Sequence, residues 1–153
     1  DDPFERVVVA NAEQLVIVTA VADPVPRTGF VDRCLVAAYA GGLRPVLCLT
    51  KADLADPEPF AAAYRELDFP VVVTRRDRPP TELAALLAGK VSALVGHSGV
   101  GKSTLVNALV PDADRAVGVV SAVGKGRHTT VAALALPLPR TPDGRDGWVV
   151  DTP

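Results

Sequence analysis

The fold is decided by one stretch of the sequence, Gly96-His97-Ser98-Gly99-Val100-Gly101-Lys102-Ser103. It fits the pattern G-x-x-x-x-G-K-[ST], which is the phosphate-binding P-loop. Glycines let the backbone turn several N–H groups into one concavity that suits an anion. Lys102 offers a positive charge to the β- and γ-phosphates of a nucleotide, and Ser103 offers a hydroxyl to Mg²⁺. The spacing therefore predicts a nucleotide site that runs on into Thr104.

The flanking sequence agrees with a P-loop. The apolar residues 91–95 before it predict a buried strand, and residues 103–110 after it predict a helix. Phosphates would then lie at a helix N-terminus, where the dipole favours negative charge. An incidental glycine turn does not account for this context. A hydrolase nucleophile elbow, G-x-S-x-G, is excluded because Val100 stands where the second glycine is needed.

The composition predicts one α/β domain. The chain has 153 residues, few aromatics and a net charge of −2, which gives no overall attraction to nucleic acid. No apolar run reaches ~18 residues, so we expect no membrane span and no membrane partner. Cys34 and Cys48 lie in apolar runs without C-x-x-C spacing, which favours buried thiols in a reducing, cytoplasmic compartment.

The sequence lacks methionine and begins with no signal peptide, so we expect residues 1–153 to be one domain of a longer protein. Strand-like and helix-like runs alternate along it, which predicts a doubly wound, mostly parallel sheet. The expected strands are residues 15–20, 45–50, 71–74, 91–95, 130–138 and 148–150. The expected helices are residues 29–40, one that begins at Pro57 behind an Asp56 cap, 82–87 behind a Thr81 cap, and 103–110.

Within these segments, we expect the inward side chains of the helices to be Phe30, Cys34, Leu35, Ala38, Phe60, Tyr64, Leu67, Leu105, Val106 and Leu109. Residues 117–127 are rich in glycine and show no period, which predicts a mobile loop. Pro137 and Pro139 close the strand at 130–138, which indicates an edge strand.

Thr50-Lys51-Ala52-Asp53 follows directly on a predicted buried strand. Strand ends are where open α/β sheets bind ligands. A carboxylate at Asp53 can accept hydrogen bonds from both N1 and N2 of guanine, whereas adenine has no such donor pair. Asp53 is therefore the candidate for choosing guanine. The alternative is that Lys51 and Asp53 merely solvate a loop.

Two further segments carry candidate site residues. Asp151 ends an apolar strand, as the acidic partner of Mg²⁺ does in nucleotide hydrolases. In Gly126-Arg127-His128-Thr129-Thr130, a threonine would reach Mg²⁺ and sense the γ-phosphate, and His128 would orient water. The alternatives are an ordinary strand-end aspartate and a flexible basic loop.

Taken in chain order, these motifs resemble those of the circularly permuted, ribosome small subunit-dependent GTPases of the RsgA/YjeQ type. Ordinary GTPases run P-loop, switch threonine, D-x-x-G and then N-K-x-D. Here Thr50-Lys51-Ala52-Asp53 comes first, followed by the P-loop, by His128-Thr129-Thr130 and by Asp151-Thr152-Pro153. The segment at 124–130 is also similar to this family's first switch. The resemblance covers nearly the whole chain.

The resemblance implies a Ras-like sheet of six strands in the order 130–138, 148–152, 91–96, 15–20, 45–50, 70–74, with strand 130–138 antiparallel. It also implies an RNA-binding β-barrel before residue 1 and a Zn²⁺-binding domain after residue 153. Thr50 replaces the family's usual asparagine, so one amide that tethers the P-loop is lost. The second switch is missing, so we expect this piece alone to hydrolyse GTP slowly.

The function implied is a Mg²⁺-dependent GTPase, a monomer, whose partners are GTP, GDP, the small ribosomal subunit and its rRNA. The nucleotide would be bound by Thr50, Lys51, Asp53, Gly96, Ser98, Gly99, Val100, Gly101, Lys102, Ser103, Thr104 and Thr130. The metal would be bound by Ser103, Thr130 and Asp151, and catalysis assigned to His128 and Lys102. Two alternatives stay open: a non-enzymatic, nucleotide-gated ribosome binder whose residues 125–128 touch RNA, and an ATPase if Asp53 is incidental.

Overall fold

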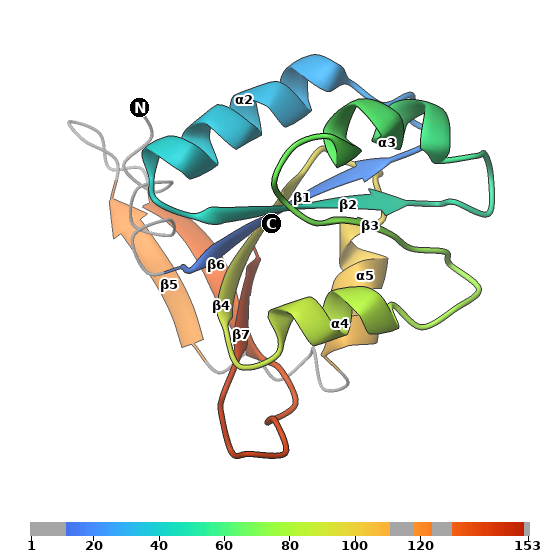
Figure 1. Ribbon diagram of the computed structural model, residues 1–153. Coiled ribbons are helices and arrows are strands. Elements are labelled where there is room, and N and C mark those ends of the chain that lie inside the picture. Colours follow the sequence, from blue (N-terminus) through green and yellow to red (C-terminus); the bar gives the residue numbers. More distant parts are fainter. Residues whose placement is uncertain (1–11, 111–117, 124–129, 152–153) are drawn as a thin grey trace.

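The computed structural model describes residues 12–110, 118–123 and 130–151, with the side chains of 12–110 and 134–151. Within these residues, seven strands form one sheet in the order β3-β2-β1-β4-β7-β6-β5 (Figure 1). The strands are β1 (Gln14–Ala20), β2 (Arg44–Thr50), β3 (Val71–Val73), β4 (Val91–Gly96), β5 (Gly118–Val123), β6 (Thr130–Pro137) and β7 (Trp148–Asp151).

The first five strands of that order are parallel to one another. β6 is antiparallel to β7, and β5 is antiparallel to β6. Every residue of β1 is buried, as is every residue of β2 after Arg44. A parallel sheet covered on both faces needs such unbroken apolar strands. This is why the apolar runs in the sequence predicted β1 and β2 correctly.

The predicted doubly wound, mostly parallel α/β fold is confirmed, and the six predicted strands lie in the predicted order. The count of six was wrong, because β5 adds a seventh strand from Gly118↔Ala135 to Val123↔Thr130. Residues 118–123 are therefore not a loop, and β6 is not an edge strand. The N–H and C=O groups on the outer side of β6 form hydrogen bonds with β5. Neither segment shows a sequence pattern that predicts this pairing.

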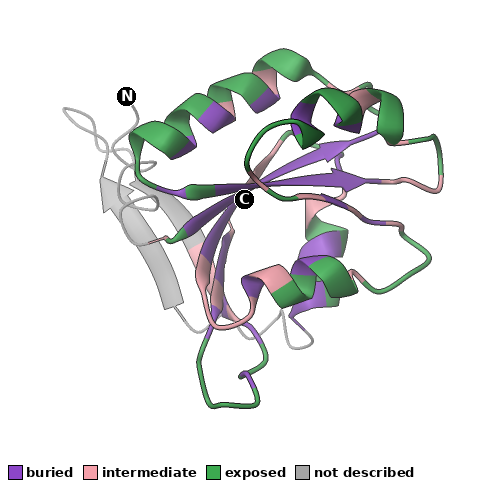
Figure 2. Ribbon diagram, viewed as in Figure 1, coloured by how far each residue is buried: buried purple, intermediate pink, exposed green. Residues whose placement is uncertain are grey.

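Helices cover both faces of the sheet (Figure 1). They are α2 (Thr28–Ala40), α3 (Glu58–Arg65), α4 (Thr81–Leu87) and α5 (Lys102–Leu109). Leu35 and Tyr64 of α2 and α3 pack in one core cluster with Ile17. Leu83 and Leu109 of α4 and α5 belong to the cluster on the other face. Burial follows this arrangement, since β1, most of β2 and the inner faces of the helices are purple in Figure 2.

The helix starts differ in detail from the prediction. Asp56 does accept a hydrogen bond from the Glu58 N–H at 3.0 Å, but α3 begins at Glu58 with Pro57 as its N-cap. Thr81 is the first residue of α4 and its side chain makes no cap, so that prediction was wrong. The cause is Pro80 before it, which occupies the N-cap position itself.

Most side chains predicted to face inward do so, with Leu67 as the exception. Leu67 lies beyond the end of α3 and is 49% exposed. Cys48 is fully buried, and that burial raises the pKa of its thiol to about 12, whereas Cys34 is half-buried. In the described part of the chain, no helix combines the length and the apolar character needed to cross a bilayer.

The parallel strands end at one edge of the sheet. Thr50 ends β2, Gly96 ends β4 and Asp151 ends β7. In open α/β sheets this carboxyl edge is where ligands bind.

Candidate functional site

The P-loop runs from Gly96, at the end of β4, to Lys102, at the start of α5. Gly99 and Gly101 have φ angles of +83° and +89°, in the left-handed region that glycine adopts without strain. A Cβ on Gly96 would lie 2.9 Å from the carbonyl oxygen of Val18 on β1. Backbone conformation and close packing thus account for these glycines.

A cavity of about 660 Å³ opens over the N-terminus of α5. The first N–H groups of a helix have no partners within the helix, and they carry the positive end of its dipole. The predicted nucleotide-binding residues that line the cavity are Thr50, Lys51, Gly96, Ser98, Gly99, Gly101, Lys102, Ser103 and Thr104. Val100 instead turns its side chain into the core.

Lys102 and Asp151 meet beside the P-loop. Lys102 Nζ lies 3.1 Å from Asp151 Oδ1, and the two side chains are 16% and 18% exposed. The same carboxylate oxygen is buried, and no hydrogen-bond donor in the described residues serves it with good geometry. An ammonium at 3.1 Å compensates its charge without completing a hydrogen bond. The arrangement leaves acceptor capacity on the Asp151 carboxylate, beside a lysine that lines the cavity.

This carboxylate oxygen, which pairs with an ammonium but accepts no hydrogen bond, is the observation that fits a divalent cation. Mg²⁺ takes oxygen ligands and usually keeps several waters, with one or two carboxylates plus substrate phosphates. Within the described residues no cluster of three His, Cys, Asp or Glu side chains exists. A metal here would therefore depend on nucleotide phosphates, on the exposed hydroxyl of Ser103 and on Asp151.

Thr50 ties the end of β2 to the P-loop. Its side chain is 4% exposed, and its Oγ1 donates a hydrogen bond to the carbonyl oxygen of Val100. The amide of the family's usual asparagine is absent, as expected, and the Thr50 hydroxyl supplies a tether to the P-loop in its place. A hydroxyl is one bond shorter than an amide, but the buried Val100 carbonyl lies within its reach.

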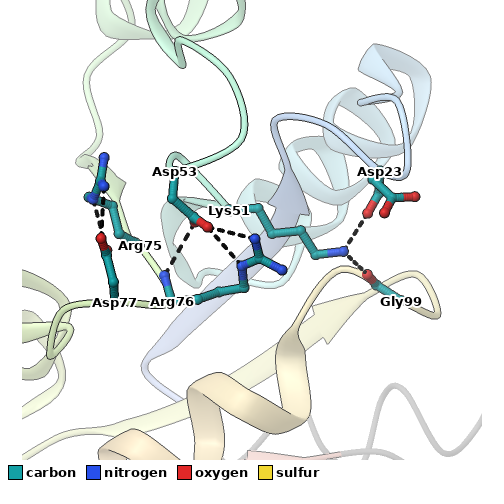
Figure 3. Close-up of polar contacts among 7 residues, drawn as sticks. All are labelled: Asp23, Lys51, Asp53, Arg75, Arg76, Asp77 and Gly99. Carbon is teal, nitrogen blue, oxygen red and sulfur yellow. Dashed lines mark hydrogen bonds and ion pairs between the residues drawn. The ribbon is translucent and has the colours of Figure 1, made fainter.

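Lys51 ties the same segment to two loops. Its Nζ donates to the carbonyl oxygens of Gly99, at 2.8 Å, and of Asp23 (Figure 3). The residue adopts φ +59°, which turns its side chain back across the P-loop. Lys51 therefore joins the phosphate loop, the β2 end and the loop after β1 into one unit.

Asp53 lies two residues on, and Arg76 occupies its carboxylate. Oδ2 accepts from Arg76 Nε at 2.9 Å and Nη2 at 2.6 Å, and Oδ1 accepts from the Arg76 backbone N–H at 3.4 Å (Figure 3). The guanidinium hydrogen bonds hold the pKa of Asp53 down at about 2. Asp53 is thus an ionised acceptor, as guanine recognition requires.

Arg76 was missed by the sequence interpretation. Its signal was present, because Arg75-Arg76 follows closely on the apolar run 71–74, and such strand ends meet at the ligand edge. A second missed contact joins His97 of the P-loop to Phe30 of α2, with ring centroids 4.2 Å apart. His128 lies outside the described residues, and of Thr130 the structure describes the backbone alone, as the first residue of β6.

The family model described as RsgA GTPase matches residues 1–153. The chain belongs to the RsgA GTPase family. The small ribosomal subunit biogenesis GTPase RsgA of Gemmatimonas aurantiaca is 43% identical over 155 residues, covering 97% of this chain and 49% of that protein. The protein of the same name from Paraburkholderia xenovorans is 42% identical over 162 residues, covering 100% of this chain and 51% of its own length.

Two solved structures resemble the fold. YjeQ from Thermotoga maritima has a TM-score of 0.67 and 32% identity, over 94% of this chain and 48% of its own. YloQ, described as a circularly permuted GTPase, has a TM-score of 0.64 and 28% identity, over 94% and 45%. The chain therefore spans about half the length of the curated RsgA relatives it matches.

Proposed function

We propose that this chain is the GTPase domain of a factor in late maturation of the small ribosomal subunit, and that it hydrolyses GTP to GDP and phosphate with Mg²⁺. Membership of the RsgA family supports the proposal. The observation that carries it is the Lys51 contact with Gly99, because this contact joins the P-loop to the segment after β2, in which Asp53 follows two residues later.

In this proposal, the P-loop amides and Lys102 bind the phosphates. The helix N-terminus supplies partial positive charge, and the lysine supplies a full one. When phosphates bind, Lys102 exchanges Asp151 for a phosphate oxygen. Ser103, Thr130 and Asp151 would hold Mg²⁺, with Asp151 acting through water. When bound, the metal neutralises charge that develops on the phosphates.

In this proposal, the segment that begins at Thr50 recognises the base. The hydroxyl of Thr50 and the ammonium of Lys51 fix the segment against the P-loop. Asp53 then accepts from guanine N1 and N2. Adenine would leave the carboxylate without those donors, and an unmatched polar group weakens binding strongly.

Hydrolysis then requires a positioned water, for which His128 is the proposed residue. Catalysis would consist of positioning and charge stabilisation. The small ribosomal subunit and its rRNA are the proposed partners, and a cytoplasmic monomer is the proposed form. An RNA-binding β-barrel and a Zn²⁺-binding domain, implied by the family resemblance, are proposed for the full protein.

Two measurements test this function. A titration of the full protein with GDP and ADP should show binding of GDP at least about 100-fold tighter, because adenine lacks the donor pair. Turnover of GTP should rise when purified small subunits are added. Equal affinity for the two nucleotides would favour an ATPase. Tight GDP binding without turnover in the presence of subunits would favour a non-enzymatic ribosome binder.

A further inference from the structure

The carboxylate that should bind guanine already accepts hydrogen bonds at both of its oxygens. Arg76 serves Asp53 Oδ2 with Nε and Nη2, and Oδ1 with its backbone N–H (Figure 3). Guanine would offer a similar pair of N–H donors to the same atoms. The guanidinium and the base edge cannot both occupy this side of the carboxylate.

The segment that carries Arg76 is anchored by its backbone. The Ala52 N–H donates to the Thr74 carbonyl at 3.1 Å, and the Thr74 N–H donates to the Leu49 carbonyl at 2.8 Å. These bonds hold the residues after β3 against the residues after β2. The Arg76 side chain itself is 50% exposed, whereas Asp53 is 18% exposed. The guanidinium can therefore swing into solvent while its backbone stays in place.

Neighbouring cations do not share this role. Arg75 pairs with Asp77 through Nε at 2.9 Å and Nη2 at 2.8 Å. The Lys51 ammonium faces Gly99 and Asp23, away from Asp53 (Figure 3). Among the described residues, Arg76 alone is seen in an ion pair with Asp53.

We propose that Arg76 competes with guanine for the Asp53 carboxylate and so determines the affinity of the base site. This inference rests on the proposed function, since it requires guanine to be the base bound. Displacement exchanges one set of N–H donors for another. The apparent affinity for guanine nucleotides is then the intrinsic affinity reduced by the population in which Arg76 holds Asp53.

The test compares Arg76→Ala with Arg75→Ala in the full-length protein. Both variants lose one positive charge from the same segment, but only the first frees Asp53. Exposed ion pairs are weak, so we expect Arg76→Ala to bind GDP about two- to fivefold tighter. The gain should come from faster association with unchanged dissociation, because the base meets a free carboxylate. Arg75→Ala, which removes another cation that lines the cavity but leaves the Arg76–Asp53 pair in place, should bind GDP no more tightly than the unsubstituted protein.

Salt gives a second readout. Raising the salt from about 0.05 to 0.5 M screens an exposed ion pair, so the advantage of Arg76→Ala over the unsubstituted protein should shrink. The GDP affinity of Arg76→Lys should lie between those of Arg76→Ala and the unsubstituted protein, since lysine keeps the charge but not the planar pair of donors.

Three outcomes would overturn the proposal. Weaker GDP binding by Arg76→Ala would show that the arginine contacts the nucleotide instead of competing with it. Equal gains in Arg76→Ala and Arg75→Ala would show a general field effect. Unchanged affinity in Arg76→Ala, with GDP binding retained, would refute the competition and leave the proposed function standing. Absence of GDP binding by the unsubstituted protein would overturn both.

Discussion

Lys102 Nζ and Asp151 Oδ1 lie 3.1 Å apart, with less than a fifth of each side chain exposed. The cation comes from the first residue of α5 and the anion from the last residue of β7. A nucleotide with Mg²⁺, bound as proposed, would bring both opposite charges to this point. Each residue can then exchange its partner for a stronger one, because charge-assisted contacts to phosphate and to a divalent ion exceed a single ion pair.

Replacing Lys102 by alanine should remove tight GDP binding. Hydrogen bonds to charged groups contribute about 1.5–3 kcal/mol each, which corresponds to roughly a 10- to 150-fold loss of affinity per contact. The fold should survive, because Lys102 lies at the cavity and outside both core clusters. Isothermal titration with GDP and circular dichroism measure the two properties. Affinity like that of the unsubstituted protein would contradict the P-loop assignment.

The matched control is Asp151→Asn, which removes the charge of the partner and keeps its shape. It should bind GDP in EDTA at least as well as the unsubstituted protein, because Lys102 no longer has a competing anion. The gain in affinity on adding Mg²⁺ should be lost. A Mg²⁺ dependence that persists in this variant would show that Asp151 is not the metal's partner.

Thr50→Val should loosen the P-loop. Valine has nearly the shape of threonine, so the change removes the hydroxyl that serves the Val100 carbonyl and little else. A buried acceptor left unpaired costs about 1–3 kcal/mol. For a domain of this size, that lowers the melting temperature by roughly 2–10 °C. GDP affinity should fall as well. Thr50→Ser retains the hydroxyl and should stay close to the unsubstituted protein, and equal melting of all three would refute the tether.

The P-loop and the positions of the strands were predictable because their physics is local, whereas the order of the strands was implied by the family resemblance and not by local sequence. A left-handed turn at Gly99 and Gly101 demands glycine, and buried parallel strands demand unbroken apolar runs. The carboxyl-edge rule then predicted Asp53 and Asp151 at the ligand edge of the sheet, and the structure brings Asp151 to the P-loop lysine. Each of these inferences needs only a short segment and its immediate flanks.

The features that escaped prediction depend on pairing between distant segments. β5 is a strand because β6 offers it an edge, although the glycines around residues 118–126 favour a loop. The partner of Thr50 is a carbonyl fifty positions away. Arg76 looks like a solvated charge until its guanidinium is seen on Asp53. Sequence periodicity carries no information about such partners.

Asp53→Asn should shift the base preference from guanine to xanthine. The change swaps one acceptor oxygen for an N–H donor, which mismatches guanine N2 and matches the oxygen at that position in xanthine. GDP affinity should fall at least about tenfold, while the affinity for xanthosine diphosphate rises. Asp56→Asn is the control, because Asp56 serves only the start of α3 among the contacts seen. Unchanged GDP affinity in Asp53→Asn would remove Asp53 from base recognition.

His128→Ala should abolish stimulation by the ribosomal subunit. β6 begins at Thr130, and Leu134 is the residue that pairs with Asp151. Because the two strands are antiparallel, Thr130 lies beyond the carboxyl end of β7, on the side of the phosphate site. The chain therefore enters β6 from the edge at which Lys102 and Asp151 meet. His128 lies two positions before β6 in the sequence, in the segment that leads into this strand. It is therefore the candidate for orienting the attacking water.

In the full-length protein, small subunits should raise GTP turnover by orders of magnitude, through contacts of Lys125 and Arg127 with rRNA phosphates. Loss of a positioned acid or base typically costs 10²–10⁴-fold, so His128→Ala should bring the stimulated rate down by about 100-fold or more. GDP affinity should stay within about twofold, since the role proposed for His128 involves the attacking water and not the base. His128→Gln can still hydrogen-bond and should retain part of the rate. Full stimulation of His128→Ala would mean that another residue positions the water.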